Sequence, residues 1–456
     1  MSTESIFKAY DIRGIYQEEL TEDVALRSAR AFATRIQKEE GREDLTFVVG
    51  QDMRLSSPAL QAAVVEGLTK QGVNVVDIGL VSTPAFYFGV AKFGYDGGIM
   101  ITASHNPGEY NGLKMVRRGA APVSRESGIM EMKEMVCTGT AFTDATTGGT
   151  VTKRNDIVAA HVAEGIQFAH AGTIRPLKVV ADCANSMGAT YIRELFHHLP
   201  CTLIEMNFEL DGSFPAHEAD PFKEENNRDL MKRIVAEDAD LGIATDGDGD
   251  RIFFFDNTGA MIEPAIVRGL LAQIFLREFP AATICYDIRP GRVTRDMIEE
   301  AGGRAVVTRV GHSLIKDVAI REGAVFAGES SGHLFVKMPH GMFEAPEIVT
   351  LKLLEYFSAS AKSVAEQVAP YRRYVHSGEI NSRVEDPAAM MNKIMEAYSP
   401  AAESTSTLDG MSIEYPKFWF NVRPSNTEPL LRLNLEAVDA NTCKAKTEEI
   451  LNMIRS

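Results

Sequence analysis

Residues that mark secreted and redox-active proteins are scarce in this chain. Its five cysteines (137, 183, 201, 285 and 443) are scattered, with no CxxC pair and no even framework. This usage excludes a disulfide scaffold and fits a reducing compartment. The opening MSTE lacks a basic and apolar signal segment, and no apolar run reaches membrane-spanning length. We therefore expect a cytoplasmic protein with no membrane partner.

Positively charged residues are also fewer than negatively charged ones. Lysine and arginine number 47 against 63 aspartates and glutamates, which gives a formal net charge of −16 at pH 7. This balance argues against a non-specific binder of nucleic acid or of anionic membranes. Small anions remain compatible with it, because they bind in local basic pockets. We expect a small-molecule partner, no nucleic acid, and a monomer or homodimer.

The order of strands and helices indicates an α/β protein. Residues 46–54 (TFVVGQDMR) predict a buried strand that ends in polar residues. A helix follows, with Ser57 as its N-cap, Pro58 at its first position and Gly72 past its end. Residues 73–77 then predict a second strand. Two strands joined through a helix by short connections indicate a parallel α/β unit.

The same kind of start recurs twice, and the tail of the chain differs from it. Residues 177–182 and 283–289 form apolar runs that reach an Asp near their ends, as residues 48–54 do. These similar segments suggest three related α/β domains, which arose either by duplication or by convergence on a common strand–turn–helix pattern. In the tail, Leu residues 431, 433 and 435 alternate with polar residues, which is typical of a half-buried antiparallel strand. A helix over 441–454 completes a smaller α+β domain.

The most informative stretch is TDGDGDR. Three carboxylates, Asp246, Asp248 and Asp250, alternate with small residues, and glycine lets the chain turn so that they converge. Converging carboxylates repel, and burying them unpaired is costly. A hard cation such as Mg²⁺ removes that cost and takes oxygen ligands. Apolar runs on both sides predict a metal loop between two strands.

Two other interpretations of the acidic stretch bear on this prediction. A solvated acidic turn is the plain alternative, because short Asp/Gly runs are common in loops. An EF-hand would need glycine at the sixth loop position and glutamate at the twelfth. Counted from Asp246, those positions hold Arg251 and Asn257, so an EF-hand is excluded.

A second stretch, GIMITASHNP, predicts a strand that delivers Ser104 into a turn fixed by Asn106 and Pro107. Three roles are open for Ser104: a helix cap, a nucleophile activated by His105, or the carrier of a phosphate neutralised by the metal. Neighbouring strand residues usually point apart, and no G-x-S-x-G elbow is present, which weakens the second role. Lys114 follows closely, as a solvated lysine or as a cation and proton donor or acceptor at the site.

Further polar residues lie at strand ends or turns. Arg13 precedes a glycine and suits an anion or a plain surface turn. His312 opens a helix after a strand, as a ligand contact or a structural residue. In the GESSGH loop, Glu329 and Ser331 suit sugar hydroxyls or form a tight polar turn. RPSNTEP at 423–429 concentrates donors into a phosphate cradle and lacks the Walker lysine pattern.

Four motifs occur together and in order: TASHNP, DGDGDR, GESSGH and RPSNTEP, at 102–107, 246–251, 328–333 and 423–429. With them the chain resembles the α-D-phosphohexomutase superfamily over its whole length, most of all its bacterial phosphomannomutase/phosphoglucomutase branch. The resemblance implies an intramolecular phosphotransferase with four domains around a central cleft. We place three related α/β domains with mixed sheets at 1–152, 153–256 and 257–369, and a C-terminal α+β domain at 370–456.

The resemblance also implies roles for individual residues. Ser104 is phosphorylated in the active enzyme, and one Mg²⁺ per chain binds the phosphoserine with Asp246, Asp248 and Asp250. Lys114 is the main candidate for general acid or base. Glu329 and Ser331 hold sugar hydroxyls, and Arg423, Ser425, Asn426 and Thr427 hold the non-reacting phosphate. The cleft is lined by Tyr10, Arg13, His105, Lys114, Arg251, His312 and His333, of which Arg13 or His312 assists Lys114.

Two positions depart from the family pattern. Arg289 stands in the strand-end motif DIR, where the mannomutase/glucomutase branch often has lysine. Arginine keeps the charge but prefers bidentate contacts, so its part in holding the sugar phosphate is open. Ser330 stands where methionine is frequent. This position flanks the contact residues, and we expect little effect on the chemistry.

The implied reaction is a reversible cycle. Phosphorylated Ser104 phosphorylates a hexose 1-phosphate (mannose and/or glucose), the resulting hexose 1,6-bisphosphate reverses, and hexose 6-phosphate leaves. The bisphosphate also serves as activator. A phosphoglucosamine mutase, a metal-dependent sugar-phosphate phosphatase and a non-catalytic sugar-phosphate sensor are the alternatives. The intact serine and aspartates weigh against the sensor, which needs no transferable phosphate.

Overall fold

The computed structural model describes residues 3–289, 291–424 and 430–456. The chain divides into two compact units. The first comprises Met1–Ile262 and Gly332–Val364, and the second comprises Glu263–Ser331 and Ala365–Ser456. Among the helices of the described ranges, none has both the length and the apolar character needed to cross a membrane.

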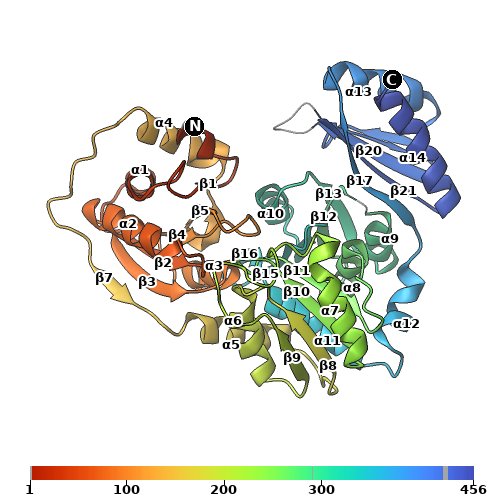
Figure 1. Cartoon of the computed structure of the whole chain (residues 1–456), viewed down its shortest axis with the longest axis horizontal. Helices are drawn as coiled ribbons and strands as arrows, with labels where there is room; N and C mark the ends of the chain where they lie inside the picture. Colours follow the sequence, from red (N-terminus) through yellow and green to blue (C-terminus); the bar gives the residue numbers. More distant parts are fainter. Residues whose placement is uncertain (1–2, 290, 425–429) are drawn as a thin grey trace. The chain divides into compact units, whose positions relative to one another are not determined.

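A mixed sheet forms the N-terminal part of the first unit (Figure 1). Strand β2 is parallel to β3 and to β4, as the strand–helix–strand pattern predicts. Strand β5 runs antiparallel to β4, and its register places Lys114 beside Met100, close to the end of β4. The order is β1-β5-β4-β2-β3-β7, with β6 paired to β5. The strands are β1 (Ile12–Ile15), β2 (Thr46–Gln51), β3 (Asn74–Leu80), β4 (Gly97–Ile101), β5 (Tyr110–Arg117), β6 (Ala121–Pro122) and β7 (Val151–Lys153).

Helices cover both faces of this sheet (Figure 1). Helices α1 and α2 share one hydrophobic core with it, in which the rings of Phe32 and Phe47 lie 5.1 Å apart. Phe86 of α3 packs on the other face, against Gly98, where an added Cβ would lie 2.7 Å from its ring. The helical segments here are η1 (Thr3–Ile6), α1 (Glu22–Glu40), α2 (Ser57–Lys70), α3 (Thr83–Lys92), η2 (Arg118–Ala120), η3 (Arg125–Ile129) and α4 (Met130–Cys137).

The predicted start of α2 is displaced by one residue. Ser56, not Ser57, is the N-cap, so Pro58 occupies the second helical position. The Ser57 hydroxyl instead donates to Asp52 Oδ1 at 2.6 Å. Because the Ser57 hydroxyl is bound to this buried carboxylate, it does not cap the helix.

The second sheet of this unit carries the acidic stretch. Strands β10 and β11 pair antiparallel as a hairpin with the acidic loop between them, which confirms the predicted loop between two strands. Strand β8 is parallel to both β9 and β10, giving the order β11-β10-β8-β9. The elements are α5 (Ile157–Ala169), β8 (Lys178–Asp182), α6 (Gly188–His197), β9 (Thr202–Met206), α7 (Glu224–Ala236), β10 (Leu241–Thr245) and β11 (Ile252–Asp256). A hairpin of β15 (Leu334–Met338) and β16 (Gly341–Glu344), followed by α11 (Pro346–Ser358), belongs to the same unit.

The second unit begins with another parallel α/β arrangement. Strand β12 lies between β13 and β14 and is parallel to both. It ends at Asp287, so the predicted strand–Asp start is present here as well. The elements are α8 (Pro264–Glu278), β12 (Thr283–Asp287), α9 (Arg292–Glu300), β13 (Arg304–Thr308), α10 (His312–Arg321) and β14 (Phe326–Gly328). The short helices α12 (Val364–Val368) and η4 (Ala369–Tyr371) lead into the tail.

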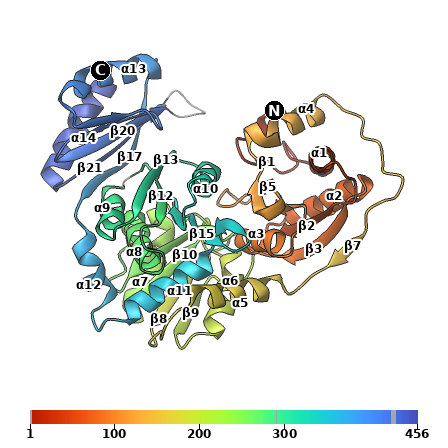
Figure 2. The same ribbon diagram turned by 180° about the vertical axis from the view of Figure 1, so that it is seen from behind.

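The tail is an antiparallel sheet with helices on one face, as the α+β prediction states (Figures 1 and 2). Its strand order is β17-β21-β20-β19-β18. The other face of β21 is covered too, because Glu436 accepts from Trp419 Nε1 at 2.6 Å and from the Arg292 N–H at 3.2 Å. The predicted antiparallel strand is confirmed. Its polar face is more buried than predicted, because Asn434 and Glu436 are buried and only Arg432 is partly exposed. The elements are β17 (Val375–Arg383), α13 (Pro387–Tyr398), η5 (Ser399–Ala401), β18 (Ser404–Ser406), β19 (Met411–Glu414), β20 (Phe418–Pro424), β21 (Leu430–Ala437) and α14 (Ala440–Ile454).

Candidate active site

Ser104 lies in the turn that follows β4, in an unusual backbone conformation. Its φ is 50°, in the left-handed region that side chains other than glycine seldom adopt. The Ser104 N–H donates to Thr102 Oγ1 at 2.9 Å. Its carbonyl faces the acidic loop so closely that a Cβ at Gly247 would lie 2.2 Å from it. Glycine at 247 therefore lets the serine turn and the acidic loop touch.

Arg54 holds this turn in place. Its Nη2 donates to the carbonyls of Ser104 at 2.8 Å and Asn106 at 2.6 Å. Its Nη1 donates to the carbonyls of Pro107 and Tyr110. The side chain is buried and pairs with Asp52 at 3.2 Å. Arg54 is not among the predicted site residues. The sequence does contain a signal for it: Arg54 lies two residues after Asp52, as Arg289 lies two residues after Asp287.

The three aspartates of the acidic loop converge in the interior, as predicted. Ser104 Oγ donates to Asp246 Oδ2 at 2.8 Å. Lys114 Nζ donates to Asp248 Oδ2 and to Asp250 Oδ2, both at 2.6 Å. All five side chains are buried. The interpretation as a solvated acidic turn is therefore wrong, because none of these carboxylates lies in solvent.

The electrostatics of the cluster favour an added cation. Burial, together with the charges of Asp250 and Asp248, raises the pKa of Asp246 to about 8. Burial opposes the charged form of Lys114, but Asp248 and Asp250 outweigh it and raise the Lys114 pKa well above its usual value. The single charge of Lys114 does not balance three carboxylates, so Asp246 is driven toward its protonated form. A further positive charge would favour its ionised form.

The carboxylate oxygens also leave room for a cation. Within the described residues, Asp248 Oδ1 and Asp250 Oδ1 are buried and accept no hydrogen bond. One oxygen from each of the three aspartates lies within 4.8 Å of the others. Buried carboxylate oxygens normally have partners. These residues therefore fit a hard divalent cation, which takes oxygen ligands.

His105 contacts Ser104, contrary to the expectation that neighbours point apart. Its Nδ1 lies 3.1 Å from Ser104 Oγ. The expectation assumed a strand, whereas the left-handed backbone of Ser104 turns both side chains to the same side. Burial, with the charges of Arg251 and Arg13, lowers the pKa of His105 to about 2. The ring is therefore neutral at pH 7.

Two predicted arginines also lie at this site. Arg13 Nη1 donates to Asn106 Oδ1 at 2.7 Å, at the end of the serine turn. The Arg251 N–H donates to Asp246 Oδ1 at 3.2 Å, and its Nε donates to His333 Nε2 at 3.1 Å. Tyr10 is half-buried just ahead of β1. The structure thus gathers Arg13, His105, Ser104, Lys114, Arg251, His333 and the aspartates in the first unit.

A second polar group lies in the other unit, at the carboxyl ends of β12 and β14. Glu329 Oε1 accepts from the Gly311 N–H at 2.7 Å, directly before His312 opens α10. Ser331 Oγ donates to Glu329 Oε2 at 3.2 Å. Arg289 Nη2 lies 3.8 Å from Glu329. The structure therefore brings Arg289, His312, Glu329 and Ser331 together.

Arg289 and Ser330 share one buried anchor. Arg289 Nε donates to Asp287 Oδ2 at 2.7 Å. Ser330 Oγ donates to Asp287 Oδ1 at 2.9 Å, and Arg268 pairs with the same carboxylate. Asp287 thus orients Arg289, which departs from the family pattern, and fixes the position of the GESSGH loop through Ser330.

The cradle predicted in the tail is described only in part. Arg423 Nη2 donates to Glu379 Oε2 at 2.6 Å, a partner from β17 that no motif predicts. Although burial opposes it, Arg423 lowers the pKa of Glu379 and keeps it ionised. Ser425, Asn426 and Thr427 lie outside the described residues, so their predicted contacts stay predictions.

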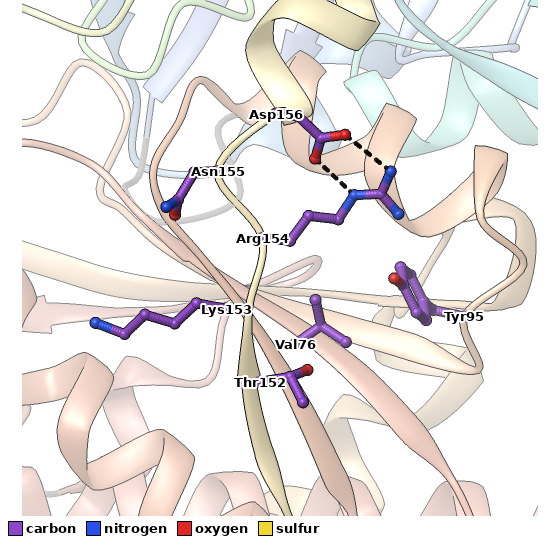
Figure 3. A pocket seen from close by; sticks show the side chains of 7 residues that line it. All are labelled: Val76, Tyr95, Thr152, Lys153, Arg154, Asn155 and Asp156. Carbon is purple, nitrogen blue, oxygen red and sulfur yellow. Dashed lines mark hydrogen bonds and ion pairs between the residues drawn. The ribbon is translucent and has the colours of Figure 1, made fainter.

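A separate hollow of about 650 Å³ lies beside β7 and the segment that leads to α5 (Figure 3). Lys153, Arg154 and Asp156 are the charged residues of its lining, and Asp156 accepts two hydrogen bonds from Arg154, of 2.8 and 3.1 Å. The guanidinium also lies 3.4 Å from the centre of the Phe93 ring. Asp156 and Phe93 thus hold this arginine in the segment that connects the two sheets.

Comparison with known families matches the chain segment by segment. The matches are to the phosphoglucomutase/phosphomannomutase α/β/α domains I, II and III at residues 4–135, 159–259 and 265–374, and to the C-terminal domain at 379–453. The matched segments follow one another in the order of the four predicted domains, whose exact limits stay predictions.

Whole-length relatives give the same result. The "phosphohexose mutases" protein of Xanthomonas campestris is 38% identical over 451 residues, covering 98% of this chain and 99% of that protein. A phosphomannomutase of Escherichia coli is 37% identical over 469 residues, with both chains covered completely. The crystal structure of a phosphoglucomutase/phosphomannomutase family protein from Burkholderia thailandensis superimposes with a TM-score of 0.90 at 32% identity, covering 99% of this chain and 97% of that one. The chain therefore belongs to the phosphoglucomutase/phosphomannomutase family and is an enzyme of the phosphotransferase isomerase type.

Proposed function

We propose that the chain interconverts hexose 1-phosphate and hexose 6-phosphate, of mannose, glucose or both, through a phosphorylated Ser104. The observation that carries this proposal is the 2.8 Å contact between Ser104 Oγ and Asp246 in a buried cluster suited to a cation. A serine that only caps a helix has no need of a place among three buried aspartates. The relatives named phosphomannomutase and phosphohexose mutases support the same activity.

The reaction has two transfers at one serine. In the first, the free hydroxyl of a hexose 1-phosphate attacks the phosphorus on Ser104. The new sugar–phosphate bond forms as the P–Oγ bond breaks, and the hydroxyl proton passes to a base. The hexose 1,6-bisphosphate then reverses, and Ser104 Oγ attacks its other phosphorus. That P–O bond breaks, the sugar oxygen takes up a proton, and hexose 6-phosphate leaves while Ser104 is phosphorylated again.

Residues of this chain supply charge and alignment, which phosphoryl transfer needs above all. We assign Asp246, Asp248, Asp250 and an oxygen on Ser104 to one Mg²⁺, which neutralises negative charge on the phosphoryl oxygens when bound. Lys114 is the candidate general acid or base. Its raised pKa keeps it charged before substrate binds. Arg13 and Arg251 orient the phosphoryl group, and His105 orients Ser104 Oγ.

The second unit supplies the sugar contacts in this proposal. Glu329 and Ser331 bind vicinal hydroxyls as acceptor and donor. Arg289 and His312 hold the sugar near them, with Arg289 presented by Asp287. Arg423, with Ser425, Asn426 and Thr427, binds the phosphate that does not react, and Tyr10 lines the cleft. The domain limits given above, a cytoplasmic location, and a monomer or homodimer belong to the same set of predictions.

Turnover of the purified protein tests this proposal. The assay contains Mg²⁺ and a trace of hexose 1,6-bisphosphate as activator, and compares the 1-phosphates of mannose, glucose and glucosamine. Ser104→Ala should abolish turnover, whereas Ser28→Ala, at a buried serine of α1, should keep it. Conversion of glucosamine 1-phosphate alone would identify a phosphoglucosamine mutase. Release of inorganic phosphate would indicate a phosphatase, and binding without turnover would indicate a sensor.

A further inference from the structure

Glu344, the last residue of β16, lies against the active-site histidine from the side away from Arg251. Its carboxylate is 1% exposed, and Oε1 lies 3.5 Å from His333 Nδ1. Asp250 Oδ1 lies 3.6 Å from the same nitrogen. The other ring nitrogen, Nε2, lies 3.1 Å from Arg251 Nε. The imidazole therefore has two carboxylates on one nitrogen and a guanidinium on the other.

These contacts decide which nitrogen carries the proton. Arginine can only donate, so His333 Nε2 must accept from Arg251 and cannot itself carry hydrogen. The proton of the neutral ring is then on Nδ1, which faces the negative carboxylates of Glu344 at 3.5 Å and Asp250 at 3.6 Å. Carboxylates that face one ring nitrogen commonly fix the tautomer of a histidine and its orientation.

The same contacts argue against a second metal ion among these residues. Asp250, His333 and Glu344 are buried and close enough to be considered as ligands. A metal on His333 Nδ1 would need the lone pair of that nitrogen, so the proton would move to Nε2. Nε2–H would then face the N–H of Arg251, donor against donor. The contact with Arg251 is therefore incompatible with a metal at Nδ1.

We propose that Glu344 is a positioning residue that holds His333 in the Nδ1–H tautomer, so that His333 Nε2 fixes the guanidinium of Arg251 for the phosphoryl group. This inference rests on the proposed function for the part played by Arg251. The backbone supports the arrangement, since the Ile252 N–H donates to the Gly332 carbonyl at 3.1 Å, beside both residues. Gly332 has a φ of 91°, which a residue with a side chain would adopt only with strain.

The first test measures the tautomer itself and does not depend on turnover. Protein labelled with ¹⁵N in its histidines is examined by NMR with Mg²⁺ present, and the His333 signals are assigned from His333→Gln. We expect a protonated Nδ1 and an unprotonated Nε2, and we expect Glu344→Leu to shift both resonances. A protonated Nε2 in the native protein, or loss of the Nδ1 proton on addition of a divalent metal, would overturn the inference.

The second test uses kinetics. Glu344→Leu should lower kcat by about 10–100-fold, with KM changed less than about threefold, because an oriented arginine stabilises the transferring group and not the bound sugar. Glu344→Gln keeps an acceptor oxygen and should restore most of kcat. Glu347 offers a matched control, since it is equally buried and pairs with His161 at 3.1 Å. Glu347→Leu should lower the melting temperature and leave kcat unchanged.

A double-mutant cycle separates positioning from a general structural effect. His333→Gln places a carbonyl oxygen near Nε2 that accepts from Arg251 and has no tautomer to set. In that background Glu344→Leu should cost less than about threefold in kcat. An undiminished loss there would show that Glu344 does not act through His333. If the native protein has no mutase turnover, the proposed function fails, and the NMR result still decides the tautomer.

Discussion

Thr83, the first residue of α3, is hydrogen-bonded twice to Asp248 of the acidic loop. Its hydroxyl donates to Asp248 Oδ2 at 2.6 Å, and its N–H donates to the Asp248 carbonyl at 2.9 Å. The two residues are 165 positions apart in the chain. The start of α3 therefore orients the carboxylate whose other oxygen is left for a cation, and the positive end of the helix favours the negative loop.

Replacing Thr83 by valine tests this orientation. Thr83→Val keeps the shape and removes the hydroxyl, so Asp248 loses one of the two donors on Oδ2. We expect the Mg²⁺ concentration for half-maximal activity to rise about tenfold or more, as for other partners of metal ligands. Activity is measured across a Mg²⁺ titration. Thr83→Ser should restore the native requirement, and an unchanged requirement in the valine variant would contradict the idea.

The backbone of Ser104 predicts a conflict between activity and stability. A left-handed conformation costs a residue with a Cβ roughly 1–2 kcal/mol, and glycine is free of this cost but loses more entropy on folding. Ser104→Gly should therefore be about 0.5–1 kcal/mol more stable than Ser104→Ala, while neither turns over substrate. Urea unfolding measures the difference. As a control, Ala31→Gly inside α1 should lower the free energy of unfolding. Equal stability of the two Ser104 variants would show that the backbone of Ser104 is not strained.

Arg54 is expected to resist replacement by lysine. Its guanidinium donates to four carbonyls around the serine turn, and an ammonium cannot span them. Arg54→Lys should cost about 1–3 kcal/mol of unfolding free energy, because buried carbonyls lose their donors, and should also lower kcat. Arg304→Lys is the control, since that side chain is 55% exposed. The prediction is refuted if both replacements have the same small effect.

His217 should make stability depend on pH. Its Nε2 lies 3.1 Å from Asp182 Oδ2 and its Nδ1 lies 2.9 Å from the Glu218 carbonyl, so both nitrogens face acceptors and the charged ring satisfies both. Burial opposes the charge, but Asp182 outweighs it and raises the pKa of His217 above 6.5. The pair therefore stabilises the fold fully below pH 6.5 and loses this effect as pH rises through the folded pKa.

Urea unfolding at pH 5.5 and pH 8.5 measures this effect. His217→Gln should remove the part of the pH dependence that comes from the pair, so its stability should fall less between the two conditions than that of the native protein. The same fall in both proteins would mean that other groups are responsible.

The sequence by itself pointed to the groups that meet at the candidate site. The aspartates of the acidic loop, Ser104 and Lys114 were all predicted, because strand periodicity and glycine-rich turns are local properties of the chain. The same local patterns predicted the strand–helix–strand order and the antiparallel tail. Local patterns were wrong about Ser57, because Ser56 is the N-cap. They also missed the burial of Glu436 on β21, which comes from its contacts with Trp419 and Arg292.

Only the tertiary structure decided how these groups are held. Arg54, Thr83 and Glu344 have no motif of their own, and each matters because it contacts a segment far away in the sequence. The left-handed turn that brings His105 onto Ser104 is likewise imposed from outside, by Arg54 and the close approach of Gly247. The sequence determined which groups take part, since side-chain chemistry is local. Their orientation and protonation depend on partners that only folding brings within hydrogen-bonding distance.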